Sequence, residues 1–136
     1  MKSISMAVVG CGDIAHIRYL YAISHRKEKF QIDAVYDRNP EVCQRTAKEL
    51  GAQAENSLES LLAIAKIDTV IVTTYHPSHA SIAIQCMEAG KNVIVEKPFA
   101  TSSADAQKVL ETAKRTGKLC MLMPPCLPIA LRSRRK

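Results

Sequence analysis

Short apolar segments alternate along the chain with segments in which apolar residues recur at helical spacing. The apolar segments have the length of strands, and the one at residues 68–74 is almost continuously β-branched, as in a strand covered on both faces. The predicted strands lie at residues 4–10, 30–37, 68–74, 92–96 and 118–123, with room for a short strand between the second and third helices. This alternation predicts the α/β class, with a doubly wound parallel sheet and right-handed crossover helices.

Start and stop signals delimit the helices between these strands. Asn39 is a predicted N-cap followed by Pro40 at the first helical position, and the helix should end at Gly51. The other predicted caps and stops are Ser57, Gly90, Ser102 or Ser103, and Gly117. In the first helix, over residues 13–26, one face carries Ile14, Ile17, Leu20, Tyr21 and Ser24.

The length and charge of the chain narrow the classes of function. A chain of 136 residues can form one domain that buries about two thirds of its unfolded surface. The formal net charge is +6, but four of the 19 positive charges lie in residues 132–136. The rest of the chain has 15 Lys and Arg against 13 Asp and Glu, so it is nearly neutral. A basic end of this kind is typical of a solvated terminus, and we expect no nucleic-acid partner.

The cysteines and the apolar runs give further exclusions. Five cysteines are scattered without a C-x-x-C pair, at positions Cys11, Cys43, Cys86, Cys120 and Cys126. This pattern favours reduced thiols over a disulfide framework or a zinc site, so no metal site is expected. No apolar run approaches the length of about 20 residues that a membrane helix needs, and the N-terminus does not resemble a signal peptide. We therefore expect a cytoplasmic protein with no membrane partner.

A glycine-rich turn follows the first predicted strand and opens the first predicted helix. Gly10, Gly12 and Ala15 form the pattern G-x-G-x-x-A, with Cys11, Asp13 and Ile14 between them. The first glycine permits a tight turn, the second lets main chain approach a pyrophosphate, and the alanine permits close packing of helix on strand. The helix N-terminus offers free N–H groups to the phosphates, whereas Asp13 suits the helix dipole. The pattern predicts a dinucleotide-binding loop.

An acidic residue stands where such a loop needs one. Asp37 ends the second predicted strand about twenty residues after Ala15, and its carboxylate can accept both ribose hydroxyls of an adenosine. It would repel a 2′-phosphate, which favours NAD as cofactor. Arg38 could pair with a 2′-phosphate, so NADP stays open. The alternative is a plain glycine turn with Asp37 capping the next helix.

With these motifs in place, the chain resembles the N-terminal half of the Gfo/Idh/MocA oxidoreductase family, which includes glucose-fructose oxidoreductase and inositol dehydrogenases. The resemblance covers nearly the whole chain, and residues 74–98 are its most specific part. They are similar to the family pattern T-P-N-x-x-H followed by A-L-x-x-G-K-H-V-x-x-E-K-P. The resemblance implies a Rossmann domain and hydride transfer between a nicotinamide and a sugar, polyol or related hydroxy compound.

The resemblance also assigns further site residues. Thr74, Tyr75, His76 and His79 fall in a loop that lines the cofactor in relatives, although Tyr75 and His76 replace the usual Pro and Asn. Main-chain contacts could survive that replacement. For His79, the alternative is a residue at a helix start that is satisfied by the main chain.

Glu96 and Lys97 complete the set. By resemblance they lie at the carboxyl edge of the sheet near the nicotinamide, where Lys97 is the catalytic residue that assists proton loss from the reacting hydroxyl. Pro98 keeps Lys97 out of helical geometry, and in relatives that peptide bond can be cis. Taken alone, Lys97 could instead be a lysine whose stem covers the end of a strand.

The resemblance predicts a domain boundary near the C-terminal end of the chain. We expect a dinucleotide-binding domain at residues 1–123 and, at residues 124–136, the start of a linker helix to a substrate domain that the chain lacks, with Pro128 matching a family proline. The acid and base partners of Lys97 that the second domain supplies would then be missing, as in a truncated enzyme. The apolar surface that normally meets that domain would be exposed, which would favour self-association. The alternative function is an NAD(P)-binding module with no catalytic activity of its own.

Overall fold

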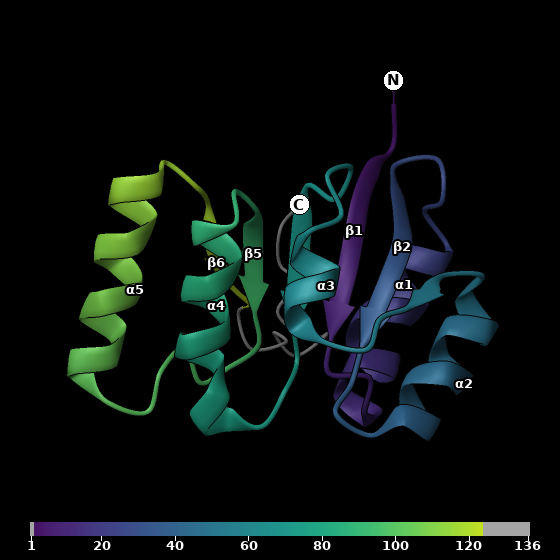
Figure 1. Ribbon diagram of the computed structural model, residues 1–136, viewed down its shortest axis with the longest axis horizontal. Coiled ribbons are helices and arrows are strands. Elements are labelled where there is room, and N and C mark those ends of the chain that lie inside the picture. The colour runs from purple at the N-terminus through teal and green to yellow at the C-terminus, as the bar shows by residue number, and fades with distance from the viewer. Residues whose placement is uncertain (1, 124–136) are drawn as a thin grey trace, which may run out of the picture.

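A six-stranded parallel sheet forms the centre of the computed structural model, which describes residues 2–123 apart from the side chain of Arg18 (Figure 1). The strands are ordered β3-β2-β1-β4-β5-β6, and every neighbouring pair is parallel. Their bounds are β1 Ile4–Val9, β2 Phe30–Tyr36, β3 Gln53–Ala54, β4 Thr69–Val72, β5 Asn92–Val95 and β6 Cys120–Leu122. This is the strand order of the Rossmann fold, so the predicted doubly wound α/β class is confirmed.

The helices cover the sheet on both faces (Figure 1). Their bounds are η1 Ala15–Leu20, α1 Tyr21–Ser24, α2 Pro40–Leu50, α3 Leu58–Leu62, η2 His76–Ser78, α4 His79–Glu88 and α5 Ser103–Thr116. The segment η1 is a π-helix that continues into α1, and η2 is a single 3₁₀ turn. Residues of α3, α4 and α5 pack in one apolar cluster, and residues of η1 and α2 pack in the other.

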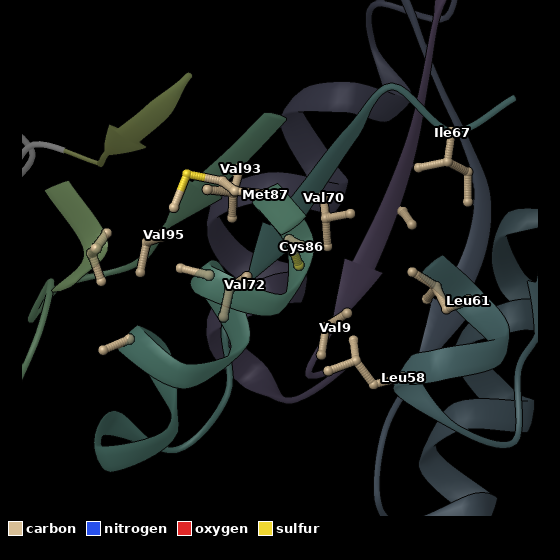
Figure 2. Close-up of a cluster of buried hydrophobic side chains, with 14 of the residues drawn as sticks. Val9, Leu58, Leu61, Ile67, Val70, Val72, Cys86, Met87, Val93 and Val95 are labelled. Atoms are coloured by element: carbon tan, nitrogen blue, oxygen red, sulfur yellow. The ribbon is translucent and has the colours of Figure 1, made fainter. Parts of the chain in front are cut away.

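Alternate residues of the central strands enter the two clusters. Along β1, Ala7 and Val9 join the cluster drawn in Figure 2, whereas Met6 and Val8 join the second cluster on the opposite face. The β-branched run of β4 is at most 1% exposed over residues 70–72. That burial agrees with the prediction of a strand covered on both faces, and it gives the carboxyl edge of the sheet a rigid base.

The local signals placed most helix ends well. The Asn39 side chain accepts hydrogen bonds from the amides of Glu41 and Val42, and α2 ends at Gly51 with φ of 65°. Ser57 caps α3. Of the two serines that could cap α5, Ser102 does so by accepting a hydrogen bond from the Asp105 amide at 3.1 Å.

Of the five residues that the apolar spacing placed on the buried face of the first helix, Leu20 is buried and the other four are exposed. Ile17 and Tyr21 are 72% and 67% exposed, whereas Ala15, Tyr19 and Leu20 are buried. Spacing alone could not decide, because Ala15 and Tyr19 also share a helical face. The wider π-helical turn lets Leu20 join that face.

The strand β6 forms one edge of the sheet, with Met121 55% and Leu122 45% exposed. This edge and its apolar side chains agree with the expected exposed surface, while self-association remains a prediction. The predicted linker at residues 124–136, with Pro128, lies outside the described residues. Among residues 2–123, every helix is too short or too polar to cross a membrane.

Candidate functional site

The carboxyl ends of four neighbouring strands stop at one level of the sheet. Main-chain hydrogen bonds of 2.9–3.0 Å join Gly10 to the last residue of β2, Thr73 to the last residue of β1 and Glu96 to the last residue of β4. Asp37, which follows β2, extends this row. The chain leaves β1 and β4 toward opposite sides of the sheet, and open α/β sheets bind their ligands at such a point.

The two glycines of the loop have different physical roles. Gly10 has φ of 92°, and a Cβ there would lie 2.7 Å from the carbonyl carbon and oxygen of Thr73. The Thr73 hydroxyl also donates to the Gly10 carbonyl at 2.6 Å, so the loop is pressed against the start of the β4–α4 connection. At Gly12, by contrast, a Cβ would meet no protein atom within 4 Å. The fold requires Gly10, whereas a side chain at Gly12 would have open space.

The carboxylate of Asp37 is fixed by main-chain donors. One oxygen accepts from the Cys11 amide at 2.8 Å, and the other accepts from the Asn39 amide at 2.8 Å. Asp37 therefore braces the glycine loop, but it does not cap α2, because the N-cap of that helix is Asn39. An ionised carboxylate has about four acceptor positions, so two remain for a ligand.

A cavity of about 570 Å³ opens beside this carboxylate. It brings together the predicted residues Gly10, Gly12, Asp37, Arg38, Thr74 and Tyr75, and adds Asn39, Val42, Ser78 and Ile82 to its lining. Sequence reasoning missed the second set because Val42 and Ile82 look like ordinary apolar positions of α2 and α4.

The remaining loop residues lie around the cavity without lining it. Ala15 is buried, as expected where helix and strand pack closely, whereas Asp13 and Ile14 are exposed at the helix start. Cys11 is buried, and its thiol lies 3.6 Å from the carbonyl of Tyr36. Burial, and secondly the Asp37 carboxylate, raise the pKa of this thiol to about 12. Cys11 is thus an uncharged thiol that serves the site through its amide.

A hydrogen bond between two of its own side chains stabilises the loop after β4. The side-chain oxygens of Thr74 and Ser78 are 2.7 Å apart, and Tyr75 is 71% exposed at the mouth of the cavity. His76 is exposed, and its ring meets that of His79 edge to face with 5.6 Å between the centroids.

His79 is fully buried. Its Nδ1 lies 2.8 Å from the Pro98 carbonyl oxygen, and its Nε2 lies 2.8 Å from the Thr74 carbonyl oxygen. The ring therefore ties the loop after β4 to the segment after β5. This is the main-chain role that the sequence left as an alternative to cofactor contact.

Glu96 and Lys97 follow β5 with opposite exposure. Glu96 is 5% exposed, and the Tyr19 hydroxyl donates to its carboxylate at 2.6 Å. Lys97 is exposed, and the Lys97–Pro98 peptide bond is cis. Nothing in the sequence signalled Tyr19, because it lies 77 residues from Glu96.

No group of three or more His, Cys, Asp or Glu side chains within residues 2–123 could hold a metal ion. Cys11, Cys43, Cys86 and Cys120 are free thiols. Cys126 lies outside the described part of the chain.

Known proteins share this fold and sequence pattern. The GFO_IDH_MocA profile, described as an oxidoreductase family with an NAD-binding Rossmann fold, matches residues 4–123. The chain is 30% identical over 118 residues to an inositol 2-dehydrogenase/D-chiro-inositol 3-dehydrogenase of Halalkalibacterium halodurans, covering 85% of this chain and 34% of that protein. It is 39% identical over 93 residues to a 4-carboxy-2-hydroxymuconate-6-semialdehyde dehydrogenase of Sphingobium sp., covering 68% of this chain and 30% of that protein.

Solved structures of family members have the same fold. The WlbA dehydrogenase of Bordetella pertussis, in complex with NADH and UDP-GlcNAcA, matches with a TM-score of 0.86 and 28% identity over 90% of this chain and 37% of that chain. KijD10, a 3-ketoreductase of Actinomadura kijaniata in complex with NADP, matches with a TM-score of 0.83 and 28% identity over 89% of this chain and 38% of that chain. The chain thus spans about a third of the length of the relatives it matches. It belongs to the Gfo/Idh/MocA oxidoreductase family and carries that family's NAD-binding Rossmann domain.

Proposed function

We propose that the domain binds a nicotinamide dinucleotide along the carboxyl edge of its sheet, with the pyrophosphate over Gly12 and the adenosine ribose at Asp37. The observation that carries this proposal is the open space at Gly12 beside a carboxylate fixed at the wall of a 570 Å³ cavity. The main-chain N–H groups at the start of η1 suit the phosphates. Val42, Tyr75 and Ile82 supply apolar surface for an adenine.

The same geometry favours NAD over NADP. Both oxygens of Asp37 are held by main-chain amides, so the carboxylate cannot turn away from a 2′-phosphate without losing those hydrogen bonds. The Asp37 carboxylate would repel a 2′-phosphate placed beside it, whereas ribose hydroxyls would donate hydrogen bonds to its remaining acceptor positions. Arg38 is exposed beside the cavity and offsets part of this repulsion for NADP.

At the other end of the row, we propose that Glu96 and Lys97 border the nicotinamide. A bound nicotinamide supplies hydride transfer, and Lys97 would hold or relay the proton of a substrate hydroxyl at its Nζ. The substrate class is a sugar, a polyol or a related hydroxy compound, in line with the inositol dehydrogenase among the relatives.

The exposure of Lys97 separates binding from turnover. A lysine in water contributes little positioning and a screened charge. We therefore expect the described domain to bind the dinucleotide and to reduce NAD negligibly when mixed with polyols and sugars. Steady NADH formation in an absorbance assay with such a panel would overturn this separation.

The binding proposal is tested by calorimetric titration with NAD. Replacing Gly12 with Val fills the space that the pyrophosphate needs, and the affinity should fall at least about a hundredfold while the thermal midpoint stays within a few degrees. The matched control is Ala104→Val, which enlarges an exposed residue of α5 away from the cavity and should leave the affinity unchanged. Equal NAD affinities of the Gly12→Val variant and the unmodified chain would show that the dinucleotide does not bind at this cavity.

A further inference from the structure

One side-chain hydrogen bond joins two distant parts of the proposed site. The Tyr19 hydroxyl donates to a carboxylate oxygen of Glu96 at 2.6 Å, and both residues are buried, at 4% and 5% exposure. A hydrogen bond from a hydroxyl to a carboxylate is stronger than one between neutral groups, and the buried carboxylate needs such donors. This contact therefore restrains both groups strongly.

The bond joins two segments that are 77 residues apart in the chain. Tyr19 belongs to η1, the helix that begins directly after the glycine loop. Glu96 is the residue after β5, and β4 lies between β1 and β5. The helix that would receive the pyrophosphate is thus linked to the segment that would meet the nicotinamide.

The π-helical turn presents Tyr19 to this position. Ala15, Tyr19 and Leu20 form the buried face of η1, and the ring of Tyr19 packs in the second apolar cluster. Turns of this kind concentrate at functional sites. A ring fixed by packing leaves its hydroxyl little freedom, so the oxygen of Tyr19 is a fixed point.

The segment that carries Lys97 is held on its other side as well. The buried ring of His79 lies 2.8 Å from the Pro98 carbonyl oxygen. Lys97 therefore stands between two residues with buried anchors, while its own side chain is exposed.

We propose that Tyr19 is a positioning residue, which holds Glu96 and, through the main chain, Lys97 in register with the nicotinamide half of the bound dinucleotide. This inference rests on the proposed function. Tyr19 touches neither cofactor nor substrate in this account. Its hydroxyl matters for the nicotinamide end of the site and not for the adenosine end.

The test compares two ligands that differ only at the nicotinamide end. NADH carries the nicotinamide, whereas ADP-ribose lacks it and keeps the adenosine and the pyrophosphate. Tyr19→Phe removes only the hydroxyl, and it should weaken NADH binding about fivefold in calorimetry while ADP-ribose binding changes less than about twofold. The emission of bound NADH should also shift toward that of free NADH.

Two further variants sharpen the comparison. Tyr21→Phe makes the same chemical change at a 67% exposed ring of the adjoining helix, and both affinities should stay unchanged. Glu96→Gln should reproduce the selective loss for NADH, and the double variant should lose less than the sum of the two, because the residues act together.

Each other outcome has a definite meaning. Equal weakening of both ligands by Tyr19→Phe would assign the hydroxyl to general stability and overturn the positioning role. Unchanged binding of both ligands would overturn it too. If the unmodified chain bound neither ligand, the proposed function itself would fall, and the inference with it.

Discussion

The two ends of the carboxyl edge are built differently. At the proposed adenosine end, the cavity, the space at Gly12 and the fixed carboxylate of Asp37 form a preformed hollow. At the proposed nicotinamide end, the main chain around Lys97 is anchored by Tyr19 and His79, but the lysine side chain is exposed and does not line the cavity. If the proposed function is correct, this difference means that the domain binds the dinucleotide, while at the proposed nicotinamide end it fixes the main chain and leaves the Lys97 side chain in solvent.

The largest expected effect concerns the two glycines of the loop, of which Gly10 is needed for folding and Gly12 is proposed to be needed for binding. Gly10→Ala places a methyl group 2.7 Å from main-chain atoms of Thr73 at a φ of 92°, so we expect it to destabilise the fold by roughly 2–4 kcal/mol. Gly12→Ala has open space and should leave stability nearly unchanged while weakening NAD binding. Urea unfolding curves of both variants check this contrast, and similar midpoints for the two would contradict the distinct roles of the glycines.

A smaller effect concerns cofactor choice at the same end. Asp37→Asn removes the charge that opposes a 2′-phosphate, so the ratio of NADP to NAD dissociation constants should fall about tenfold. Calorimetric titrations with both dinucleotides give the ratio. Because Asp37 also braces the loop, both affinities should drop somewhat, and the ratio is the informative quantity. An unchanged ratio would remove Asp37 from the ribose site.

The smallest effect compares the thiols of Cys11 and Cys120 at alkaline pH. Burial raises the pKa of Cys120, on β6, from 9.0 to about 11, whereas Cys11 reaches about 12. A raised folded-state pKa stabilises the fold fully below the unfolded value of 9.0, and that contribution is lost as pH rises through the folded value. The thermal midpoint should therefore fall between pH 9 and pH 11, an interval set by these pKa values, and fall less in a Cys120→Ala variant. Parallel declines in the two proteins would exclude a contribution from this thiol.

Local chemistry accounts for what could be predicted from the sequence. The caps at Asn39 and Ser57 and the turn at Gly10 depend on residues close in the chain, so their signals are readable. The β-branched run of β4 correctly predicted a strand that is covered on both faces. The order of these signals was sufficient to predict the fold class and the place of the glycine-rich turn after β1.

Contacts between distant segments account for what could not be predicted. The face by which the first helix packs depends on the sheet beneath it, and apolar spacing favoured Ile17 although Tyr19 is buried. The bond from Tyr19 to Glu96 and the contacts of His79 join elements that only the folded sheet brings together. Local patterns carry no information on such pairs, so Tyr19 was missed, and for His79 the sequence left cofactor contact and a main-chain role as alternatives.

The most direct test of the central claim is an amide NMR titration of the isotopically labelled chain with NAD. The account predicts that the largest shifts fall on residues 10–15, on Asp37 and on Thr74, with smaller shifts at Glu96 and Lys97. Shifts confined to the opposite, amino edge of the sheet, or no shifts at saturating NAD, would contradict a dinucleotide site at the carboxyl edge.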